Sequence, residues 1–211
     1  MLRFGSLSKS YSGTPVLEDL SVEFPATGVH YIAGENGQGK TTLFKCIAGL
    51  EQHLGEITWD GGPTSGHIAA SFEDSPAHGT LSGLKNLSAT LDRPVKAVKS
   101  DDRTTRFLGM RDLRKRARAY SFGQRKRLSL TSLFMDEAPC LLLDEPTVGL
   151  DASGLQILAA EINKASETKC ILLTGHYVDF YSTLANRYYL LSGHHLSDVT
   201  EERHSLAEEG M

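Results

Sequence analysis

The chain has 211 residues, with 22 basic and 26 acidic side chains and a formal net charge of -4 at pH 7. Its length suits one domain, or one domain with an inserted lobe, and its charge excludes a general attraction to nucleic acid or anionic lipid. Cys46, Cys140 and Cys170 are widely separated within apolar stretches, which excludes a CxxC metal site and predicts buried, reduced thiols.

We expect a soluble, cytoplasmic chain. The first six residues contain no basic segment followed by a long apolar run, so no secretory signal is predicted. The strongest apolar runs, residues 140–143 and 171–173, have the length of strands and are too short to cross a bilayer.

The amino-terminal part predicts a lobe of short strands. Residues 16–24 alternate apolar and polar side chains, residues 55–62 indicate an edge strand ending in a glycine-rich turn, and residues 67–72 indicate a further strand. Helical segments separated by glycine, proline and charged residues then predict a small helical lobe at about residues 74–120.

From residue 121 onward, helices and strands are expected to alternate. Helices are predicted at 123–135, 153–165 and 178–185, and strands at 140–144, 169–174 and 188–192. Nearly continuous apolar strands between helices are typical of a parallel sheet covered on both faces. The predicted fold class is therefore α/β, with a mixed sheet core, an antiparallel β lobe and a helical lobe in one domain spanning residues 1–211.

A glycine-rich run lies between a predicted strand at 29–33 and a predicted helix at 42–48, which Gly49 ends. Its GxxxxGK[ST] pattern predicts a phosphate-binding loop, in which backbone N–H groups and the helix N-terminus surround phosphate oxygens. Lys40 would reach the β- and γ-phosphates of ATP, and Thr41 would bind Mg²⁺. A glycine-rich turn that serves packing alone is the alternative. The run comprises Gly34, Glu35, Asn36, Gly37, Gln38, Gly39, Lys40, Thr41 and Thr42.

Two carboxylates follow the apolar strand at 140–143, at the strand edge where ligands bind in open α/β sheets. Asp144 suits Mg²⁺ binding and Glu145 suits polarisation of an attacking water, although acidic pairs also serve as helix caps. His176 follows the strand that ends at residue 174 and is either a γ-phosphate sensor or an ordinary loop histidine.

The order of these motifs resembles the ATPase subunits of ABC transporters over nearly the whole chain. Residues 120–128 are similar to the family signature usually written LSGGQ, and Ser121 is a good N-cap for the helix that follows. Leu150 and Asp151 match the D-loop, and His176 matches the switch histidine. Tyr11 matches the aromatic residue that stacks on adenine, although a lone tyrosine usually just packs.

The resemblance implies that two copies, or two paired ATPase subunits, bind two ATP molecules and Mg²⁺ between them. Lys40, Thr41, Asp144, Glu145 and His176 would come from one copy. The signature and D-loop would come from the other, through Ser121, Gly123, Gln124 and Asp151. A separate membrane permease is implied, with the ATPase peripheral to the inner face of the cell membrane.

Two positions depart from the common family pattern. Phe122 replaces the first glycine of the signature pair, and Glu73 stands where most relatives have glutamine near Mg²⁺ and the γ-phosphate. Both resemble the branch that exports drugs and antimicrobial peptides, although drift at tolerant positions is equally open. We expect Glu73 to lie at the catalytic metal site and to retune hydrolysis.

Three further patterns each have a structural and a functional interpretation. The basic run at residues 111–118 lacks interleaved aromatics, so we expect a solvated face and no direct nucleic-acid binding. His194 and His195, taken as strand neighbours, would point to opposite faces and share no metal. A stripe of leucines at 81, 84, 87 and 91 could dock a permease helix or pack internally. The alternative function is a soluble ABC ATPase that acts in iron–sulfur assembly or nucleic-acid maintenance.

Overall fold

A computed structural model describes residues 1–73 and 77–202. Its contacts divide the chain into two compact units. The first, which we call the sheet unit, comprises Met1–Ala70, Ala138–Glu145 and Ile162–Met211. The second, the helical unit, comprises Ser71–Glu137 and Pro146–Glu161. The boundaries expected for a single domain with a helical lobe at 74–120 stay a prediction.

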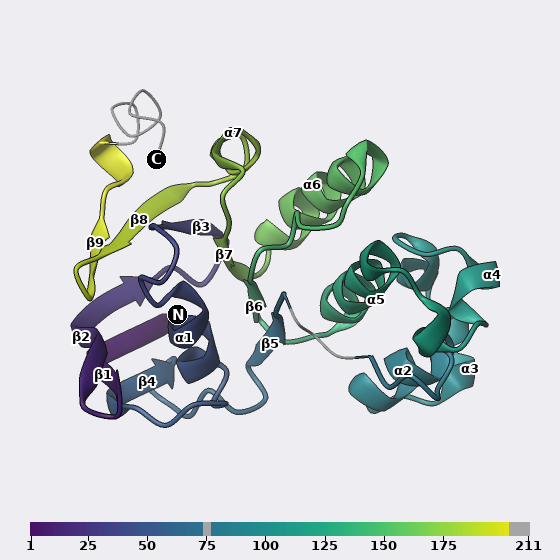
Figure 1. Ribbon diagram of the computed structural model, residues 1–211, viewed down its shortest axis with the longest axis horizontal. Coiled ribbons are helices and arrows are strands. Elements are labelled where there is room, and N and C mark those ends of the chain that lie inside the picture. Colours follow the sequence, from purple (N-terminus) through teal and green to yellow (C-terminus); the bar gives the residue numbers. More distant parts are fainter. Residues whose placement is uncertain (74–76, 203–211) are drawn as a thin grey trace. The chain divides into compact units, whose positions relative to one another are not determined.

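The amino-terminal strands form a three-stranded antiparallel sheet in the order β2-β1-β4 (Figure 1). The strands are β1 (Leu2–Tyr11), β2 (Thr14–Phe24) and β4 (Leu54–Trp59), so β4 is the edge strand that the sequence predicts. Leu2, Phe4 and Leu7 of β1 are buried, which gives this sheet one apolar face.

The second sheet has six strands in the order β5-β6-β7-β3-β8-β9. Strands β6, β7, β3 and β8 run parallel, and β9 pairs antiparallel with β8. All residues of β6 and β7 are buried, as near-continuous apolar strands of a covered sheet should be. The strands are β3 (Gly28–Ala33), β5 (Ile68–Ser71), β6 (Cys140–Leu143), β7 (Cys170–Thr174), β8 (Arg187–Ser192) and β9 (His195–Asp198).

The remaining elements of the sheet unit are α1 (Lys40–Ile47), α7 (Val178–Ser182) and the short η3 (Thr200–Glu202). Helix α6 (Ala152–Ser166) begins in the helical unit and ends in the sheet unit. The α/β fold class is confirmed, and all three cysteines are buried free thiols as predicted.

The helical unit is built around an apolar core. Its elements are α2 (Gly83–Thr90), α3 (Val95–Ser100), η1 (Asp102–Thr105), α4 (Met110–Leu113), η2 (Ala117–Ala119) and α5 (Phe122–Met135). Leu84 and Leu87 are buried in this core, and Leu91 packs against it. Three leucines of the stripe, at 84, 87 and 91, therefore pack internally, and docking of a permease helix on this stripe stays a prediction.

Two other expectations concern the carboxy-terminal part of the chain. His194 has φ +71° in the turn between β8 and β9, so only His195 lies on a strand. The acidic sequence at 201–209 favours a solvated helix or a frayed tail, and this prediction lies outside the described residues after residue 202. Within the described parts of the chain, no helix combines the length and apolar character that a membrane span requires.

Candidate functional site

The loop between β3 and α1 depends on glycine at two positions where the chain approaches its neighbours. A β-carbon on Gly34 would lie 2.5 Å from the Leu191 carbonyl oxygen, and one on Gly39 would lie 2.7 Å from Val16 Cγ1. Gly39 also has φ +100° and immediately precedes Lys40, the first residue of α1. The strand–loop–helix geometry predicted for this segment is present, with the helix starting two residues earlier than expected.

Lys40 lies within this loop and is buried. Its Nζ donates to the carbonyl oxygens of Gly34 at 2.5 Å and Glu35 at 2.9 Å. Burial lowers the pKa of Lys40, and the nearby carboxylates of Glu145 and Asp144 oppose that shift. The ammonium is thus held in the curve of the loop, where a phosphate group would be recognised.

Asp144 is held by one threonine on each of its carboxylate oxygens. Thr41 Oγ1 donates to Oδ2 at 2.8 Å, and Thr174 Oγ1 donates to Oδ1 at 2.7 Å. Asp144 and Thr174 are both buried, so these bonds fix the carboxylate at the end of β6. Thr174 was not predicted as a site residue, although it ends the strand next to β6 at the same sheet edge.

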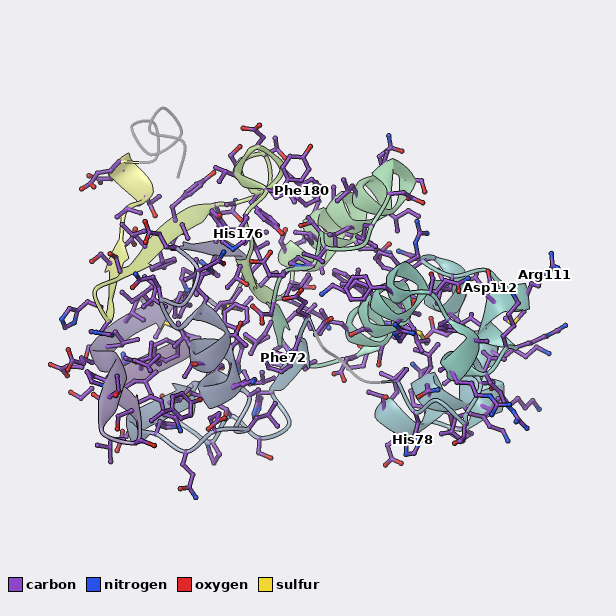
Figure 2. All side chains as sticks on the ribbon, in the orientation of Figure 1. Phe72, His78, Arg111, Asp112, His176 and Phe180 are labelled. Carbon is purple, nitrogen blue, oxygen red and sulfur yellow. The ribbon has the colours of Figure 1, made fainter. Side chains whose placement is uncertain are left out.

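Glu145 and His176 meet at this edge. His176 Nε2 lies 3.2 Å from Glu145 Oε1, and Figure 2 shows His176 by the end of β7. Glu145 has φ +48°, a left-handed conformation that is costly for a glutamate and persists only where the surrounding structure enforces it. Its backbone N–H donates to Thr174 Oγ1 at 3.3 Å, which ties its position to that of Asp144.

The residues present fit a magnesium ion. The Thr41 hydroxyl and the Asp144 carboxylate are hard oxygen ligands 2.8 Å apart. In the part of the chain that the structure describes, no three His, Cys, Asp or Glu side chains are grouped as an all-protein metal site. Magnesium fits such a site because it usually takes one or two protein oxygens and completes its shell with phosphate and water.

A buried tyrosine supports the segment that carries His176. Tyr31 Oη donates to the Gly175 carbonyl oxygen at 2.7 Å, and its ring stacks on Tyr181 at 5.1 Å between centroids. Burial, with a smaller effect of Glu145, raises the pKa of Tyr31 to about 12, so the hydroxyl stays a donor at neutral pH. Sequence patterns gave no signal for this contact.

Tyr11 and Glu73 lie on the surfaces of different units. Tyr11 ends β1 with 43% of its surface exposed, and Lys9 Nζ lies 4.6 Å from its ring centroid. The exposed face of the Tyr11 ring could stack on a ligand once the Lys9 side chain moves away from it. Glu73 is exposed in the helical unit, two residues after β5. Its predicted role at the metal remains a proposal.

The signature segment forms the capped start of α5. The Ser121 side chain accepts from the Gln124 backbone N–H at 3.2 Å, while Gln124 Oε1 accepts from the Ser121 N–H at 3.1 Å. This capping box confirms Ser121 as the N-cap. A β-carbon on Gly123 would lie 2.5 Å from the Gly149 carbonyl oxygen, so glycine is required there. Phe122 begins the helix and is 45% exposed.

Asp151 stands at the start of α6 in the same unit. Its Oδ1 accepts from Arg127 at 2.7 Å, from Ser153 at 2.7 Å and from the Gly154 backbone N–H at 2.8 Å. The carboxylate therefore caps α6 and joins it to α5 through Arg127. These contacts lower the pKa of Asp151, with Ser153 the largest cause, and keep it ionised.

Comparison with known proteins gives one consistent family. A family model described as ABC transporter matches residues 17–148. The lantibiotic transport ATP-binding protein SrtF of Streptococcus pyogenes is 28% identical over 88% of this chain and 84% of its own length. The cobalt import ATP-binding protein CbiO of Salmonella typhimurium is 26% identical over 90% of this chain and 77% of its own length.

A solved structure shows the same fold. It is described as an ATP binding subunit of an ABC transporter and has a TM-score of 0.80, with 21% sequence identity. The match covers 100% of this chain and 95% of that chain.

Proposed function

The chain belongs to the ABC transporter family as an ATP-hydrolysing subunit, and on that premise we propose that it drives an exporter through a separate membrane permease. The observation that carries this proposal is the joint placement of Thr41, Asp144, Glu145 and His176 at one edge of the sheet. These side chains supply an oxygen-ligand pair and an oriented carboxylate, which are the groups that phosphoryl transfer to water requires.

Each group has a separate role in the proposed hydrolysis. Lys40 would exchange its two loop carbonyls for phosphate oxygens of ATP. Thr41 and Asp144 would hold Mg²⁺, which supplies charge neutralisation to the phosphates when bound. Glu145 would accept a hydrogen bond from the attacking water, and His176 would keep the Glu145 carboxylate oriented toward it.

We propose that two copies, or this chain and a paired ATPase subunit, close around two ATP molecules. Ser121, Gly123 and Gln124 at the N-terminus of α5 would face the γ-phosphate bound by the other copy, because a helix N-terminus attracts anions. Asp151 would lie at the same interface, and Tyr11 would stack on adenine within its own copy. ATP then joins the copies, and hydrolysis releases them.

The export direction and the drug or bacteriocin branch are proposed from two residues and one relative. Phenylalanine at 122 and glutamate at 73 are similar to the residues of that branch at the same motif positions. SrtF, to which this chain is similar, is a lantibiotic transport protein. The similarity to CbiO concerns an import protein, so direction must be measured in this protein. The proposed location is the cytoplasmic face of the cell membrane, held there by the permease.

The test is copurification of the tagged chain with an integral membrane protein, followed by transport assays in proteoliposomes. We expect ATP-dependent movement of cargo from the ATPase side to the opposite side, and its loss in Lys40→Ala. Movement in the reverse direction would replace the exporter proposal with an importer. An ATP-hydrolysing chain that copurifies only with soluble iron–sulfur assembly proteins would support the scaffold alternative.

A further inference from the structure

The basic run carries five exposed cationic side chains in the helical unit. We call its five exposed cationic side chains the basic face, and Figure 2 shows one of them, Arg111, projecting outward from α4. Leu113, Ala117 and Tyr120 are buried in the core beneath it. The basic face comprises Arg111, Arg114, Lys115, Arg116 and Arg118.

The backbone that carries the basic face is fixed by residues 79–83, which lead into α2. Gly83 N–H donates to the Lys115 carbonyl at 3.2 Å, and Ala117 N–H donates to the Leu81 carbonyl at 2.9 Å. Arg118 N–H donates to the Gly79 carbonyl at 2.9 Å. Together with the buried side chains, these bonds fix the backbone from which the exposed cationic side chains extend.

The charge of the basic face is largely uncompensated. Asp112 is the single acidic residue from Arg103 to Met135, and it pairs with Lys115 at 2.6 Å. Among the described residues, none of the four arginines of the basic face forms an ion pair. Other arginines of the helical unit form ion pairs: Arg103 pairs with Asp101, and Arg127 pairs with Asp151. The face therefore offers guanidinium groups to an external anion.

We propose that the basic face binds the phosphate groups of an anionic phospholipid bilayer. Guanidinium groups bind phosphate in a bidentate manner, and clusters of four to eight basic residues are typical of binding to anionic lipid surfaces. The choice of a bilayer as the polyanion rests on the proposed function, because a subunit that acts on a membrane permease works beside lipid headgroups.

The absence of aromatic residues favours lipid over nucleic acid. The run at residues 111–118 contains no aromatic residue, and the neighbouring Tyr120 is buried, so the basic face offers no aromatic ring on which bases could stack.

The test is cosedimentation of the purified chain with vesicles. Phosphatidylcholine vesicles with about one-third phosphatidylserine are compared with pure phosphatidylcholine, at about 0.1 M and about 0.5 M salt. We expect binding only to the anionic vesicles, with loss at the higher salt. Arg114→Ala/Arg116→Ala should weaken binding about 25-fold, since each surface cation contributes about fivefold.

Lys96→Ala/Lys99→Ala is the matched control, because both lysines are exposed on α3 and their removal changes net charge equally. We expect the control to bind within about twofold of wild type. An equal loss in the control, or no vesicle binding by folded wild type, would overturn the proposal. Tighter, Arg114- and Arg116-dependent binding to duplex DNA at the same salt would assign the face to nucleic acid instead.

ATP affinity is measured in every variant as a separate readout. All these substitutions should leave it unchanged, because none lies in the sheet unit that carries Lys40 and Asp144. A chain that binds ATP and copurifies with its permease but ignores anionic vesicles would refute lipid binding while leaving the proposed function standing.

Discussion

The ring of Phe122 lies against Gly149 so closely that a β-carbon on Gly149 would be 2.7 Å from two ring carbons. Gly149 also has φ +78°, a conformation that side chains other than glycine rarely adopt. The aromatic residue that departs from the common signature is thus accommodated by a glycine in the loop before Asp151. The start of α5 and this loop pack as one piece.

Gly149→Ala should lower the free energy of unfolding by about 1–3 kcal/mol, because the new methyl group overlaps the Phe122 ring. In a Phe122→Ala background the same change should cost less, leaving mainly the strain of positive φ. Urea unfolding of the two single variants and the double variant measures this coupling. Strictly additive effects would show that the ring contact does not constrain the loop.

Glu145→Gln should retain ATP binding and reduce turnover about 10²–10⁴-fold, because an amide cannot accept the proton of an attacking water. ATP-bound dimers should then accumulate and be visible by size-exclusion chromatography. Glu167→Gln is the control, since Glu167 is exposed beyond the end of α6. Unchanged turnover in Glu145→Gln would remove the assignment of Glu145 as the polarising base.

Thr174→Val should destabilise the chain by about 1–3 kcal/mol, because it removes a hydrogen bond from the buried Asp144 carboxylate. Turnover should also need more Mg²⁺, since the carboxylate is no longer oriented. Thr174→Ser keeps the hydroxyl, so its turnover should need the same Mg²⁺ concentration as wild type. If valine and serine variants need the same Mg²⁺ concentration, Thr174 has no positioning role.

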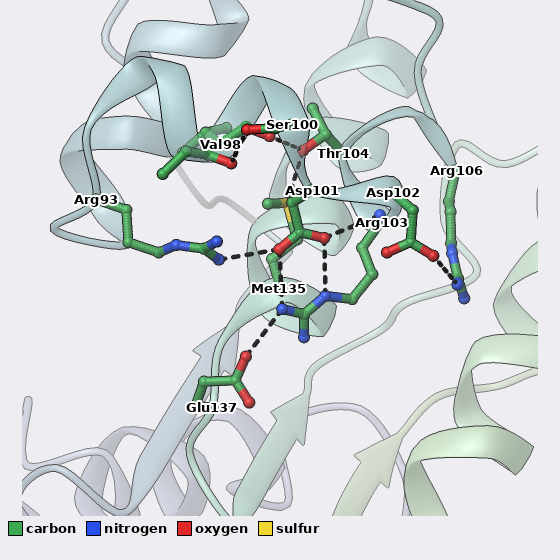
Figure 3. Close-up of polar contacts among 11 residues, drawn as sticks. Arg93, Val98, Ser100, Asp101, Asp102, Arg103, Thr104, Arg106, Met135 and Glu137 are labelled. Atoms are coloured by element: carbon green, nitrogen blue, oxygen red, sulfur yellow. Dashed lines mark hydrogen bonds and ion pairs between the residues drawn. The ribbon is translucent and has the colours of Figure 1, made fainter.

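Asp101 should make the helical unit sensitive to acid. Its carboxylate accepts from Arg103 at 3.0 and 2.9 Å and from Arg93 at 3.1 Å, and Arg103 also reaches Glu137 (Figure 3). Arg103 is the largest cause that holds the pKa of Asp101 well below its usual range. Because the folded-state pKa is depressed, this stabilisation is present above about pH 4 and is lost as the pH falls further.

Asp101→Asn should therefore lower the free energy of unfolding by about 1–3 kcal/mol at neutral pH and by much less in strong acid. Urea unfolding at about pH 7 and about pH 3 measures both values. Asp92→Asn is the control, because Asp92 is exposed. An equal loss at both pH values would mean that Asp101 acts by packing and not by charge.

Glu73→Gln should preserve folding and ATP affinity, since Glu73 is exposed. If its carboxylate tunes catalysis, the basal ATPase rate or the cargo moved per ATP should change when the permease is present. Both quantities are compared with wild type in the same membranes. Identical values would favour drift at this position.

For most of the elements that sequence patterns delimited, the bounds agree to within one or two residues, because buried strands and capped helices leave strong local signals. Residues 140–144 and 169–174 were predicted as strands and are β6 and β7. Strand β1 was not delimited, since its pairing with β2 shifts register after Phe4, Leu7 and Lys9 and breaks the apolar alternation. The length of β1 is defined by its pairing with both β2 and β4.

The site was predictable where chemistry follows a motif and unpredictable where it depends on strand order. Asp144 and Glu145 end an apolar strand and follow from local sequence. The support from Thr174 and Tyr31 requires β7 to lie between β6 and β3, which no local pattern specifies. The leucine stripe shows the same limit, because helical periodicity identifies an apolar side without saying which neighbour covers it.

The two hydrogen bonds from Lys40 to its own loop bear on the nucleotide cycle. Because Gly34 and Glu35 already accept from the ammonium, the side chain is preorganised, and little rotamer freedom remains to be lost on binding. In the proposed role of Lys40, the phosphates of ATP would compete with these internal acceptors, and the measured affinity for ATP would report the difference in free energy between two hydrogen-bonded states of the ammonium.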